Sequence, residues 1–441
     1  AKIVEFFTSI REVYETGDLV SLRLLEEREA SQGSLPVGNI SANEVTLTLN
    51  NESKKFDLDN ENSPLKNLLK PNRRIQAWLG AEAENAATEN PPTFTRNSVA
   101  YLSDGTQVAA NVPRFEQGKF GKAVMVEEGT TNLVTNPSFE SGMWPELWES
   151  ANGTATLVTG WNGSGNAARI TIGVENSKFG IISARNMSLT EGVTYAISFR
   201  ARAVRDNFPI TYMYLMSSTV GNHLLPAVYI GTAWRRYTIT YTIPAGKTAS
   251  NYGLMIAIDS KRADVYANDW IEVDDVQLEA KPYPTSFING TRAAETLTIP
   301  TAGVLNPQEG TVEFWAKVDS LRNYGCFLQS YVSSPSATDR FAIYYTANGS
   351  LQYEIAGYNV RYVSPNNTLQ VGSWAFIAMT WKNGTLYAYF NGQLLGIASP
   401  SVNATIGSIL YIGCGASGQQ INGLIDDFRI SSRARTDEEI L

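Results

Sequence analysis

Two Asn-Gly pairs interrupt Trp-Lys-Asn-Gly-Thr-Leu-Tyr-Ala-Tyr-Phe-Asn-Gly-Gln-Leu-Leu, residues 381–395. Apolar and polar residues alternate beside them, and Asn-Gly tolerates the positive φ angles of a tight hairpin. The stretch Phe-Ala-Ile-Tyr-Tyr-Thr-Ala-Asn-Gly-Ser-Leu-Gln-Tyr-Glu-Ile, residues 341–355, repeats the pattern. Further Asn-Gly pairs begin at positions 152, 162, 289 and 422. Short antiparallel strands should therefore dominate the fold.

The composition also favours strands and turns. Aromatic residues make up 11% of the chain and charged residues only 18%, with 21 Tyr and 35 Gly. This balance is typical of β-proteins. A length of 441 residues is enough for two or three domains. We expect an all-β protein built from several modules.

Charge and hydropathy exclude several kinds of partner. The net charge of −8 supplies no basic field for phosphate backbones or anionic lipid, so nucleic acid is not expected. No apolar run approaches membrane-spanning length, which argues against membrane insertion. The first residues lack the features of a signal peptide. Because the chain starts without Met, in what reads as a strand, the N-terminal domain is expected to be incomplete.

Residues 81–92 have the composition of a linker. They read Ala-Glu-Ala-Glu-Asn-Ala-Ala-Thr-Glu-Asn-Pro-Pro, which is small, polar and closed by two prolines. Before them, Glu-Val-Thr-Leu-Thr-Leu-Asn at 44–50 alternates cleanly, as a strand does. Residues 1–80 are therefore predicted to form a small β-domain.

The N-terminal segment resembles tail and baseplate proteins of phages and prophages. The resemblance rests on Gly-Ser-Leu-Pro-Val-Gly-Asn-Ile-Ser-Ala-Asn-Glu-Val-Thr-Leu-Thr-Leu-Asn at 33–50, with Asn-Ser-Pro-Leu at 62–65 and Leu-Lys-Pro-Asn-Arg-Arg-Ile at 69–75. It implies that residues 1–80 attach the protein to other tail or baseplate subunits. The protein would be assembled in the bacterial cytoplasm and act outside the cell, in a virion or tail-like particle. Tail symmetry makes a homo-oligomer of three or six copies the expected state.

A second segment is similar to carbohydrate-binding modules of the family 4/9/22 type. It opens with Thr-Asn-Leu-Val-Thr-Asn-Pro-Ser-Phe-Glu-Ser-Gly at 131–142, followed by Trp144 and Trp148. It closes with Trp-Ile-Glu-Val-Asp-Asp-Val-Gln-Leu-Glu at 270–279. The resemblance implies a β-sandwich jelly roll at 135–280.

A third segment is similar to laminin-G-like, concanavalin-type jelly rolls. The resemblance rests on three stretches: Gly-Thr-Val-Glu-Phe-Trp-Ala-Lys-Val at 310–318, Trp-Ala-Phe-Ile-Ala-Met-Thr-Trp at 374–381 and Gly-Leu-Ile-Asp-Asp-Phe-Arg-Ile at 423–430. Such modules open with a Gly-Lys-x-Gly-x-Ala element, which here lies far upstream at 118–123. We therefore expect this jelly roll to comprise 93–134 and 281–441, with the other module inserted between them.

Both sandwich segments contain an Asp-Asp pair at which the alternation of apolar residues changes phase. Such a slip predicts a β-bulge, which re-aims one carboxylate. A structural Ca²⁺ held by carboxylates and carbonyls would explain the acidic pairs. The carbohydrate-module resemblance points to Glu140 and Asp275 as ligands, and Asp426 with Asp427 is the corresponding candidate in the other module. The alternative is a bulge whose aspartates cap turns or face water.

Catalysis is not expected. The only histidine is His223, so most base chemistry near neutral pH is missing. Jelly-roll glycosidases related to laminarinases carry Glu-x-Asp-x-Glu or Glu-x-Asp-x-x-Glu. Here Glu272 and Asp274 are followed by Val276 and Gln277, so the third carboxylate is missing.

Sugar recognition needs apolar platforms for pyranose faces and polar partners for hydroxyls. Tyr212 and Tyr214 share one face of a predicted strand, whereas Trp161, Asn222 and His223 lie in predicted loops. These five residues are the candidate ligands. The competing interpretation places the aromatic rings in the core, as is expected for the tryptophans of the fold-defining patterns, Trp234, Trp315, Trp374 and Trp381.

The sequence thus favours a non-enzymatic tail protein that binds cell-surface polysaccharide. Two alternatives stay open, a purely structural tail subunit without sugar binding and an accessory module of a secreted glycosidase. The two cysteines, Cys326 and Cys414, lie too far apart in the chain for a Cys-x-x-Cys motif, and buried free thiols are favoured over a disulfide.

Overall fold

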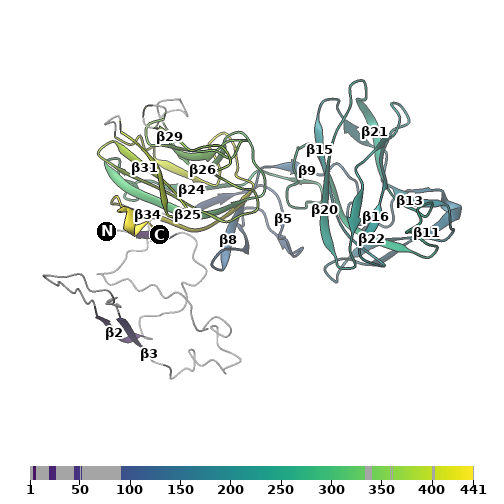
Figure 1. Cartoon of the computed structure of the whole chain (residues 1–441), viewed down its shortest axis with the longest axis horizontal. Coiled ribbons are helices and arrows are strands. Elements are labelled where there is room, and N and C mark those ends of the chain that lie inside the picture. Colours follow the sequence, from purple (N-terminus) through teal and green to yellow (C-terminus); the bar gives the residue numbers. More distant parts are fainter. Residues whose placement is uncertain are drawn as a thin grey trace, which may run out of the picture. The chain divides into compact units, whose positions relative to one another are not determined.

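The protein is built almost entirely from antiparallel strands, as predicted (Figure 1). The computed structural model describes residues 3–5, 19–25, 44–49, 51, 91–332, 340–357, 359, 361–399 and 403–440. The only helical elements in these ranges are two short 3-10 turns, η1 (Ser150–Asn152) and η2 (Asp437–Glu439). No helix in the described ranges has the length and hydropathy to cross a membrane.

Two sheets form the C-terminal sandwich. The first runs in the order β32 (Gln393–Ala398), β31 (Thr385–Phe390), β30 (Ala375–Lys382), β25 (Glu309–Val318), β34 (Gly423–Ser431), β8 (Lys122–Val126), β7 (Arg114–Gln117), and β1 (Ile3–Glu5) also pairs with β34. The second runs β29 (Arg361–Val363), β28 (Leu351–Glu354), β27 (Phe341–Tyr345), β26 (Gly325–Ser330), β33 (Ile409–Ile412), β24 (Thr296–Pro300), β4 (Thr93–Thr95). The β27–β28, β30–β31 and β31–β32 pairs confirm the hairpins predicted at the Asn-Gly turns.

Alternation along β25 decides which of its side chains enter the core. Phe314 and Ala316 are fully buried between the sheets, whereas Trp315 points out and stays partly exposed. Trp381 of β30 is fully buried and donates its indole N–H to the carbonyl of Asn306 at 2.8 Å. The core prediction is therefore right for Trp381 and wrong for the three other tryptophans, which keep partial exposure: Trp234, Trp315 and Trp374.

The C-terminal sandwich takes strands from both sides of the segment 135–280. Strands β4, β7 and β8 precede that segment, and β24 to β34 follow it. The two connections meet in a short ladder of β9 (Thr130–Thr131) and β23 (Thr291–Arg292). We therefore propose the domain division into 93–134 with 281–441 and an inserted 135–280.

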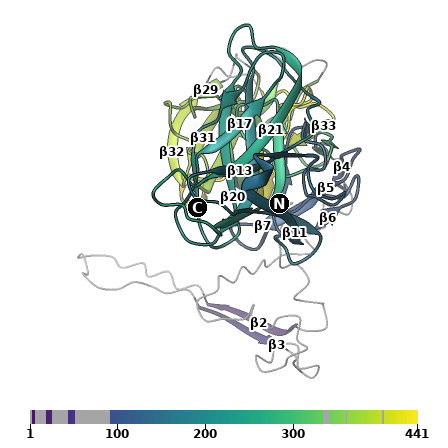
Figure 2. The ribbon, with the colours of Figure 1, turned by 90° about the vertical axis from the view of Figure 1, so that its right-hand side faces the viewer.

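The segment 135–280 forms a second structure, here called the central sandwich. Its first sheet runs β10 (Glu146–Trp148), β13 (Lys178–Ile182), β21 (Ala249–Asp259), β17 (Tyr212–Met216), β18 (His223–Leu224), with β14 (Met187–Leu189) also beside β21. Its second sheet runs β11 (Gly153–Thr159), β12 (Asn166–Ile172), β22 (Trp270–Glu279), β15 (Thr194–Ala203), β20 (Arg235–Thr242). Figure 2 shows β13, β21 and β17 side by side.

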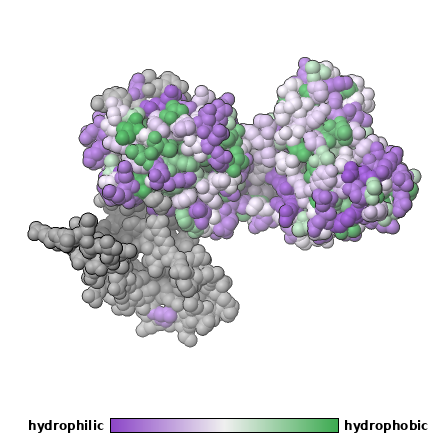
Figure 3. Space-filling model, viewed as in Figure 1, coloured by the Kyte–Doolittle hydropathy of each residue, from purple (hydrophilic) through white to green (hydrophobic). Residues whose placement is uncertain are grey.

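Smaller ladders complete the described part. They are β16 (Phe208–Ile210) with β19 (Val228–Ile230), and β5 (Ala100–Tyr101) with β6 (Gln107–Val108). Buried apolar side chains fill each sandwich separately, for example Phe199 and Ile256 in the central one. The visible surfaces of both sandwiches mix hydrophilic residues with hydrophobic patches (Figure 3).

The two predicted bulges are confirmed. The register of β15 against β22 shifts opposite Asp275, and Asp275 adopts a φ of 46°. The register of β25 against β34 shifts opposite Asp427, which adopts a φ of 50°. A non-glycine residue at positive φ re-aims its side chain relative to its neighbours, so the two aspartates of each pair point to different surroundings.

Residues 8–84 form a unit of their own, distinct from residues 1–7 and 85–441. Within it, β2 (Leu19–Leu25) pairs with β3 (Glu44–Leu49), which confirms the strand predicted at 44–50. The rest of the predicted domain 1–80 and most of the linker 81–92 lie outside the described residues. In the C-terminal sandwich, Cys326 and Cys414 are buried free thiols, as favoured by the sequence.

Removing the central sandwich should leave the C-terminal sandwich folded. The amide of Leu133 donates to the carbonyl of Leu278 at 2.8 Å, so the two ends of the segment lie one hydrogen bond apart. A short Gly-Ser bridge in place of 136–280 would therefore close the chain with little strain. We expect a cooperative unfolding transition from this variant in circular dichroism. Loss of that transition would show that 93–134 depends on the central sandwich for its fold.

Candidate functional site

Three aromatic rings gather on the outer face of the first sheet of the central sandwich. The rings of Trp148 and Tyr212 are stacked, with centroids 5.0 Å apart and planes inclined by 26°. Tyr214 meets Tyr212 edge-on at 4.8 Å. All three side chains are partly exposed. We call this set the aromatic face.

Strand register brings these rings together from distant parts of the sequence. Trp148, Gly180, Ala257 and Tyr212 occupy one row across β10, β13, β21 and β17. The two middle residues are small, which leaves room for the outer rings to lean over them and stack. A Cβ added at Gly180 would lie 2.5 Å from the Cβ of Ala257, so the row tolerates nothing larger there.

Apolar and charged residues support and flank the aromatic face. Ile182, Met216 and Met255 are buried beneath the rings. Lys178 places its Nζ 3.5 Å from the centroid of Tyr212 and 3.8 Å from the Oδ2 of Asp259. The face thus combines flat apolar surface with an ammonium and a carboxylate at its edge, the combination that sugar rings and hydroxyls require.

Alternation in β17 explains why Tyr212 and Tyr214 face outward. The intervening Met213 and the following Leu215 are fully buried in the core. Burial raises the pKa of Tyr214, and the adjoining Tyr212 adds to the shift. Tyr214 therefore remains a protonated donor at neutral pH.

The other three predicted ligands do not join the aromatic face. His223 lies in strand β18 rather than in a loop, and register places it opposite Leu215, toward the core. It is only 9% exposed and lies 3.2 Å from the hydroxyl of Tyr252. Burial lowers its pKa, as does the charge of Lys247. Asn222 is an exposed residue in the turn before β18.

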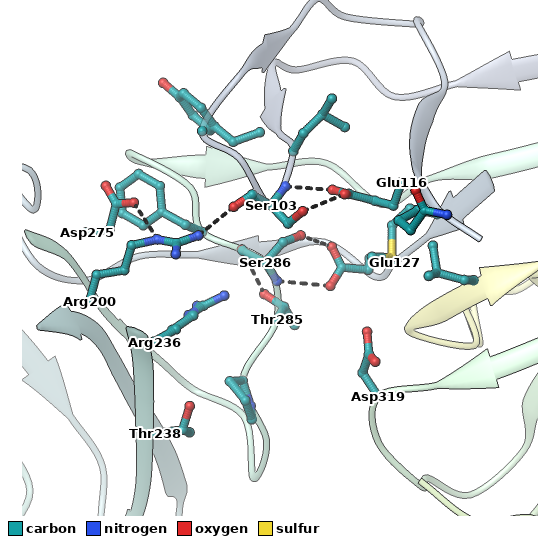
Figure 4. A pocket seen from close by; sticks show the side chains of 18 of the residues that line it. Ser103, Glu116, Glu127, Arg200, Arg236, Thr238, Asp275, Thr285, Ser286 and Asp319 are labelled. Carbon is teal, nitrogen blue, oxygen red and sulfur yellow. Dashed lines mark hydrogen bonds and ion pairs between the residues drawn. The ribbon is translucent and has the colours of Figure 1, made fainter. Parts of the chain in front are cut away.

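Trp161 belongs to a different part of the central sandwich. It lies in a turn after β11, where the guanidinium carbon of Arg200 sits 3.3 Å from the centroid of its ring. Arg200 also donates to the carbonyl of Ser103 at 2.6 Å and lies 3.4 Å from Asp275 (Figure 4). One face of the Trp161 ring is therefore covered by an arginine rather than open to a sugar.

The acidic pair of the central sandwich is divided between two environments. Asp275 accepts from the hydroxyl of Ser138 at 3.0 Å and faces Arg200. Asp274 accepts from the amides of Trp161 and Asp275 and has no ion-pair partner in the described residues. Burial raises the pKa of Asp274 to about 7, and the negative charges of Asp275 and Glu140 add to the shift.

Glu140 is the other carboxylate of this region. It accepts from the amide of Asn166 at 2.9 Å, and in the described residues no basic side chain forms an ion pair with it. A side chain at Gly165, which has a φ of 64°, would collide with Glu140. Two carboxylates without cationic partners fit a hard cation. No group of three or more His, Cys, Asp or Glu side chains gathers in the described ranges, so backbone carbonyls and water would have to complete such a site.

Asp426 and Asp427 of the C-terminal sandwich have protein partners. Asp426 accepts from the amide of Phe120 at 2.9 Å, and Asp427 forms an ion pair with Arg429 at 2.7 Å. The arginine neutralises Asp427, which leaves Asp426 as a single carboxylate for a cation. We therefore confine the calcium proposal to the central sandwich.

Glu272, the first residue of the incomplete glycosidase pattern, is held by two arginines. It is fully buried, and its two oxygens lie 2.5 Å from Arg169 and from Arg202. A general acid must reach the bond that it protonates, whereas both oxygens of Glu272 are enclosed and held by guanidinium groups. This geometry supports a structural ion pair rather than a catalytic acid.

Each sandwich matches a family model over part of the chain. Residues 131–262 match the family model described as a carbohydrate binding domain, and residues 289–441 match that of the concanavalin A-like lectin/glucanases superfamily. These matches confirm the two predicted sandwich resemblances. A search of curated proteins gave no match to the chain.

Solved structures that match part of the chain include several carbohydrate-binding modules. Domain 4 of an extracellular arabinanase from Geobacillus stearothermophilus is 20% identical, with a TM-score of 0.28, over 33% of this chain and 71% of that chain. A family 4 carbohydrate-binding module is 21% identical, with a TM-score of 0.24, over 33% and 100%. The sialidase module from Ruminococcus gnavus, bound to sialyllactose, is 14% identical, with a TM-score of 0.25, over 30% and 80%.

Sequence reasoning missed Trp148 and Lys178 as members of the aromatic face. Trp148 lies in the opening pattern of the carbohydrate-module segment, so a signal was present, but only the strand order places it beside Tyr212. Lys178 carries no local signal, because its position over the Tyr212 ring depends on pairing between β13 and β21.

Proposed function

We propose that the protein is a non-catalytic adhesin that binds cell-surface polysaccharide on the aromatic face. The observation that carries the proposal is the stacked pair of Trp148 and Tyr212, with Tyr214 beside them, exposed on a sheet rather than buried in the core. The match of this segment to a carbohydrate binding domain supports it.

The geometry favours extended chains over single sugars. An open sheet face offers few contacts to each pyranose ring, so single-site affinity should be modest. Several copies of the protein on one particle would raise the apparent affinity through effective concentration. Such weak, multivalent binding suits adhesion to a surface that displays many identical glycans.

Titration of the full chain with soluble polysaccharides tests the proposal. We suggest β-glucan, xylan, arabinan and galactan, together with envelope polysaccharide from candidate host bacteria. Each aromatic platform removed should cost about 1 kcal/mol, or about fivefold in affinity. Replacing Trp148, Tyr212 and Tyr214 together by Ala should therefore weaken binding by roughly a hundredfold.

A matched control is available on the same sandwich. Tyr229 of β19 is 51% exposed and lies outside the aromatic face, so Tyr229→Ala should leave binding unchanged. Equal affinity of the triple variant and the wild type would place the sugar elsewhere. Absence of binding to every polysaccharide would favour the purely structural alternative.

The proposed setting is a virion or phage-tail-like particle. The resemblance of the N-terminal segment to tail and baseplate proteins supports it, and residues 1–80 would then attach the protein to other tail subunits. We expect three or six copies per particle, because tails are built on symmetric rings and fibres. Quantitative mass spectrometry of purified particles measures the copy number directly. Recovery of the protein with a secreted glycosidase instead would favour the accessory-module alternative.

We also propose that Glu140 and Asp274 hold a structural Ca²⁺ in the central sandwich, with Asp274 in place of the predicted Asp275, because Asp275 faces Arg200. The ion would link the loop that opens the sandwich to its last strand, β22. Its proposed role is to neutralise buried charge and fix the loop, without contact to the sugar on the aromatic face.

A further inference from the structure

A pocket lies where the two sandwiches meet, away from the aromatic face. It has a volume of about 530 Å³. Trp161, Arg236 and Thr238 line it from the central sandwich, and the C-terminal sandwich contributes Met125, Asp319 and Leu424. We call it the junction pocket (Figure 4). Its volume is within the range of small-molecule sites.

Two charged groups in the junction pocket have unused hydrogen-bonding capacity. Arg236 donates through Nη2 to Ser198 at 2.7 Å, and no hydrogen bond to the described residues uses its Nη1. No hydrogen bond or ion pair joins the carboxylate of Asp319 to a residue in the described ranges. Figure 4 shows the two side chains on different elements, Arg236 in β20 and Asp319 directly after β25. A donor and an acceptor are thus both available to one ligand.

The remaining charges of the pocket offset one another. Glu116 accepts from the amide of Ser103 at 2.6 Å, and the opposite charge of Lys317 lies over the ring of Trp374. Arg200 is engaged with Asp275 and Ser103. Glu127 is held by Arg114 behind the pocket wall. No surplus of one sign is left to select a charged ligand. The lining therefore suits a neutral molecule that carries both hydrogen-bond donors and acceptors as well as apolar C–H surface.

We propose that the junction pocket is a second saccharide site, which binds a short neutral sugar between Arg236 and Asp319. Hydroxyls of the sugar would accept from the guanidinium and donate to the carboxylate. The side chains of Met125 and Leu424 provide apolar surface for the C–H groups of the ring. This site is distinct from the aromatic face and does not depend on the function proposed there.

Isothermal titration of the full chain with neutral disaccharides and trisaccharides of the gluco, xylo, arabino and galacto series tests the proposal. Arg236→Gln and Asp319→Asn each remove a charge-assisted hydrogen bond and should weaken binding roughly ten- to hundredfold. Arg235→Gln is the matched control, because Arg235 is exposed and lies outside the pocket. Arg236→Lys preserves the positive charge and should retain part of the affinity if Gln perturbs folding.

The response to pH supplies an independent readout. Burial raises the pKa of Asp319 to about 6. Among the neighbouring charges, Glu127 and Glu116 raise this pKa further, whereas Lys317 and Arg236 lower it. Protonation removes the strongest acceptor, so sugar affinity should fall as the pH drops through 6. The Asp319→Asn variant should show no such fall.

Comparison with the aromatic-face variants separates the two sites. Short sugars should bind the Tyr212→Ala/Tyr214→Ala variant as tightly as the wild type. Loss of their binding in that variant, with no effect of Arg236→Gln or Asp319→Asn, would overturn the proposal. So would binding of only a uronic acid or an amino sugar, or of none of the sugars. Polysaccharide binding to the wild type would still test the aromatic face in each case.

Discussion

Replacing Arg114 by Met should lower the free energy of unfolding of the C-terminal sandwich by about 3 to 5 kcal/mol, because it leaves buried carboxylates without their partner. Arg114 is fully buried. It donates to Glu295 through both Nε and Nη2 at 2.8 Å and to Glu127 at 2.7 Å. Arg96 and Arg292 extend the network.

The network joins the two stretches of chain that flank the central sandwich. Arg96, Arg114 and Glu127 precede it, whereas Arg292 and Glu295 follow it. Burial alone would lower the pKa of Arg114, but Glu127 and Glu295 more than offset this and raise it. For Glu127, burial opposes ionisation, yet Arg292 and Arg114 hold its pKa well below the ordinary range. The charges are therefore mutually dependent.

Chemical denaturation of the variants measures this dependence. Arg433→Met is the control, because Arg433 and Glu439 form an ion pair at the surface, where such pairs contribute about 0 to 1 kcal/mol. The double variant Arg114→Met/Glu295→Met should regain part of the loss, since it also removes one stranded charge. A change below 1 kcal/mol in Arg114→Met would contradict a buried network.

The stability of the central sandwich should depend on pH through Asp274. Its pKa is raised to about 7, whereas an unfolded aspartate titrates near 4. The protonated group carries no penalty below pH 4. As the pH rises from 4 to 7, the unfolded aspartate ionises while the folded one stays protonated, so folding is disfavoured by up to roughly 4 kcal/mol for a shift of this size, and the loss is complete above pH 7. The unfolding free energy should therefore fall between pH 4 and 7 in the presence of a chelator.

Calcium should reverse this fall if Glu140 and Asp274 hold the ion. Addition of Ca²⁺ at pH 7.5 should raise the melting temperature of the wild type. Asp274→Asn should lose both the pH-dependent fall in unfolding free energy and the response to calcium. The readout is the slope of unfolding free energy against pH, because Asn also loses an acceptor and so changes the absolute stability. Asp264→Asn, at a 53% exposed carboxylate, should keep both. Equal pH slopes for Asp274→Asn and the wild type would contradict the assignment.

Local patterns predict the strands well but not the neighbours across a sheet. The Asn-Gly hairpins and the β-bulges at Asp275 and Asp427 depend only on residues close in sequence. Both features could therefore be predicted from the sequence alone. The direction of Trp315 also follows from alternation along β25, once Phe314 is placed in the core. The family resemblance had favoured a buried ring there.

The candidate site depends on pairing over long separations. Tyr212 and Tyr214 were predicted correctly to share one face of a strand, because that relation is local. The stacking of Tyr212 on Trp148 requires the order β10, β13, β21, β17, which no local pattern encodes. His223 was misplaced for the same reason, since its inward orientation follows from its register with Leu215.

Hydroxyl-radical footprinting of the full chain, with and without the polysaccharide that binds best in titration, tests the central claim most directly. The rings of the aromatic face are partly exposed in the free protein, so they should be oxidised without ligand. The proposal predicts that polysaccharide protects Trp148, Tyr212 and Tyr214 while the oxidation of Tyr229 stays unchanged. Protection of Tyr229 or another exposed ring, with the three rings of the aromatic face oxidised as before, would contradict it.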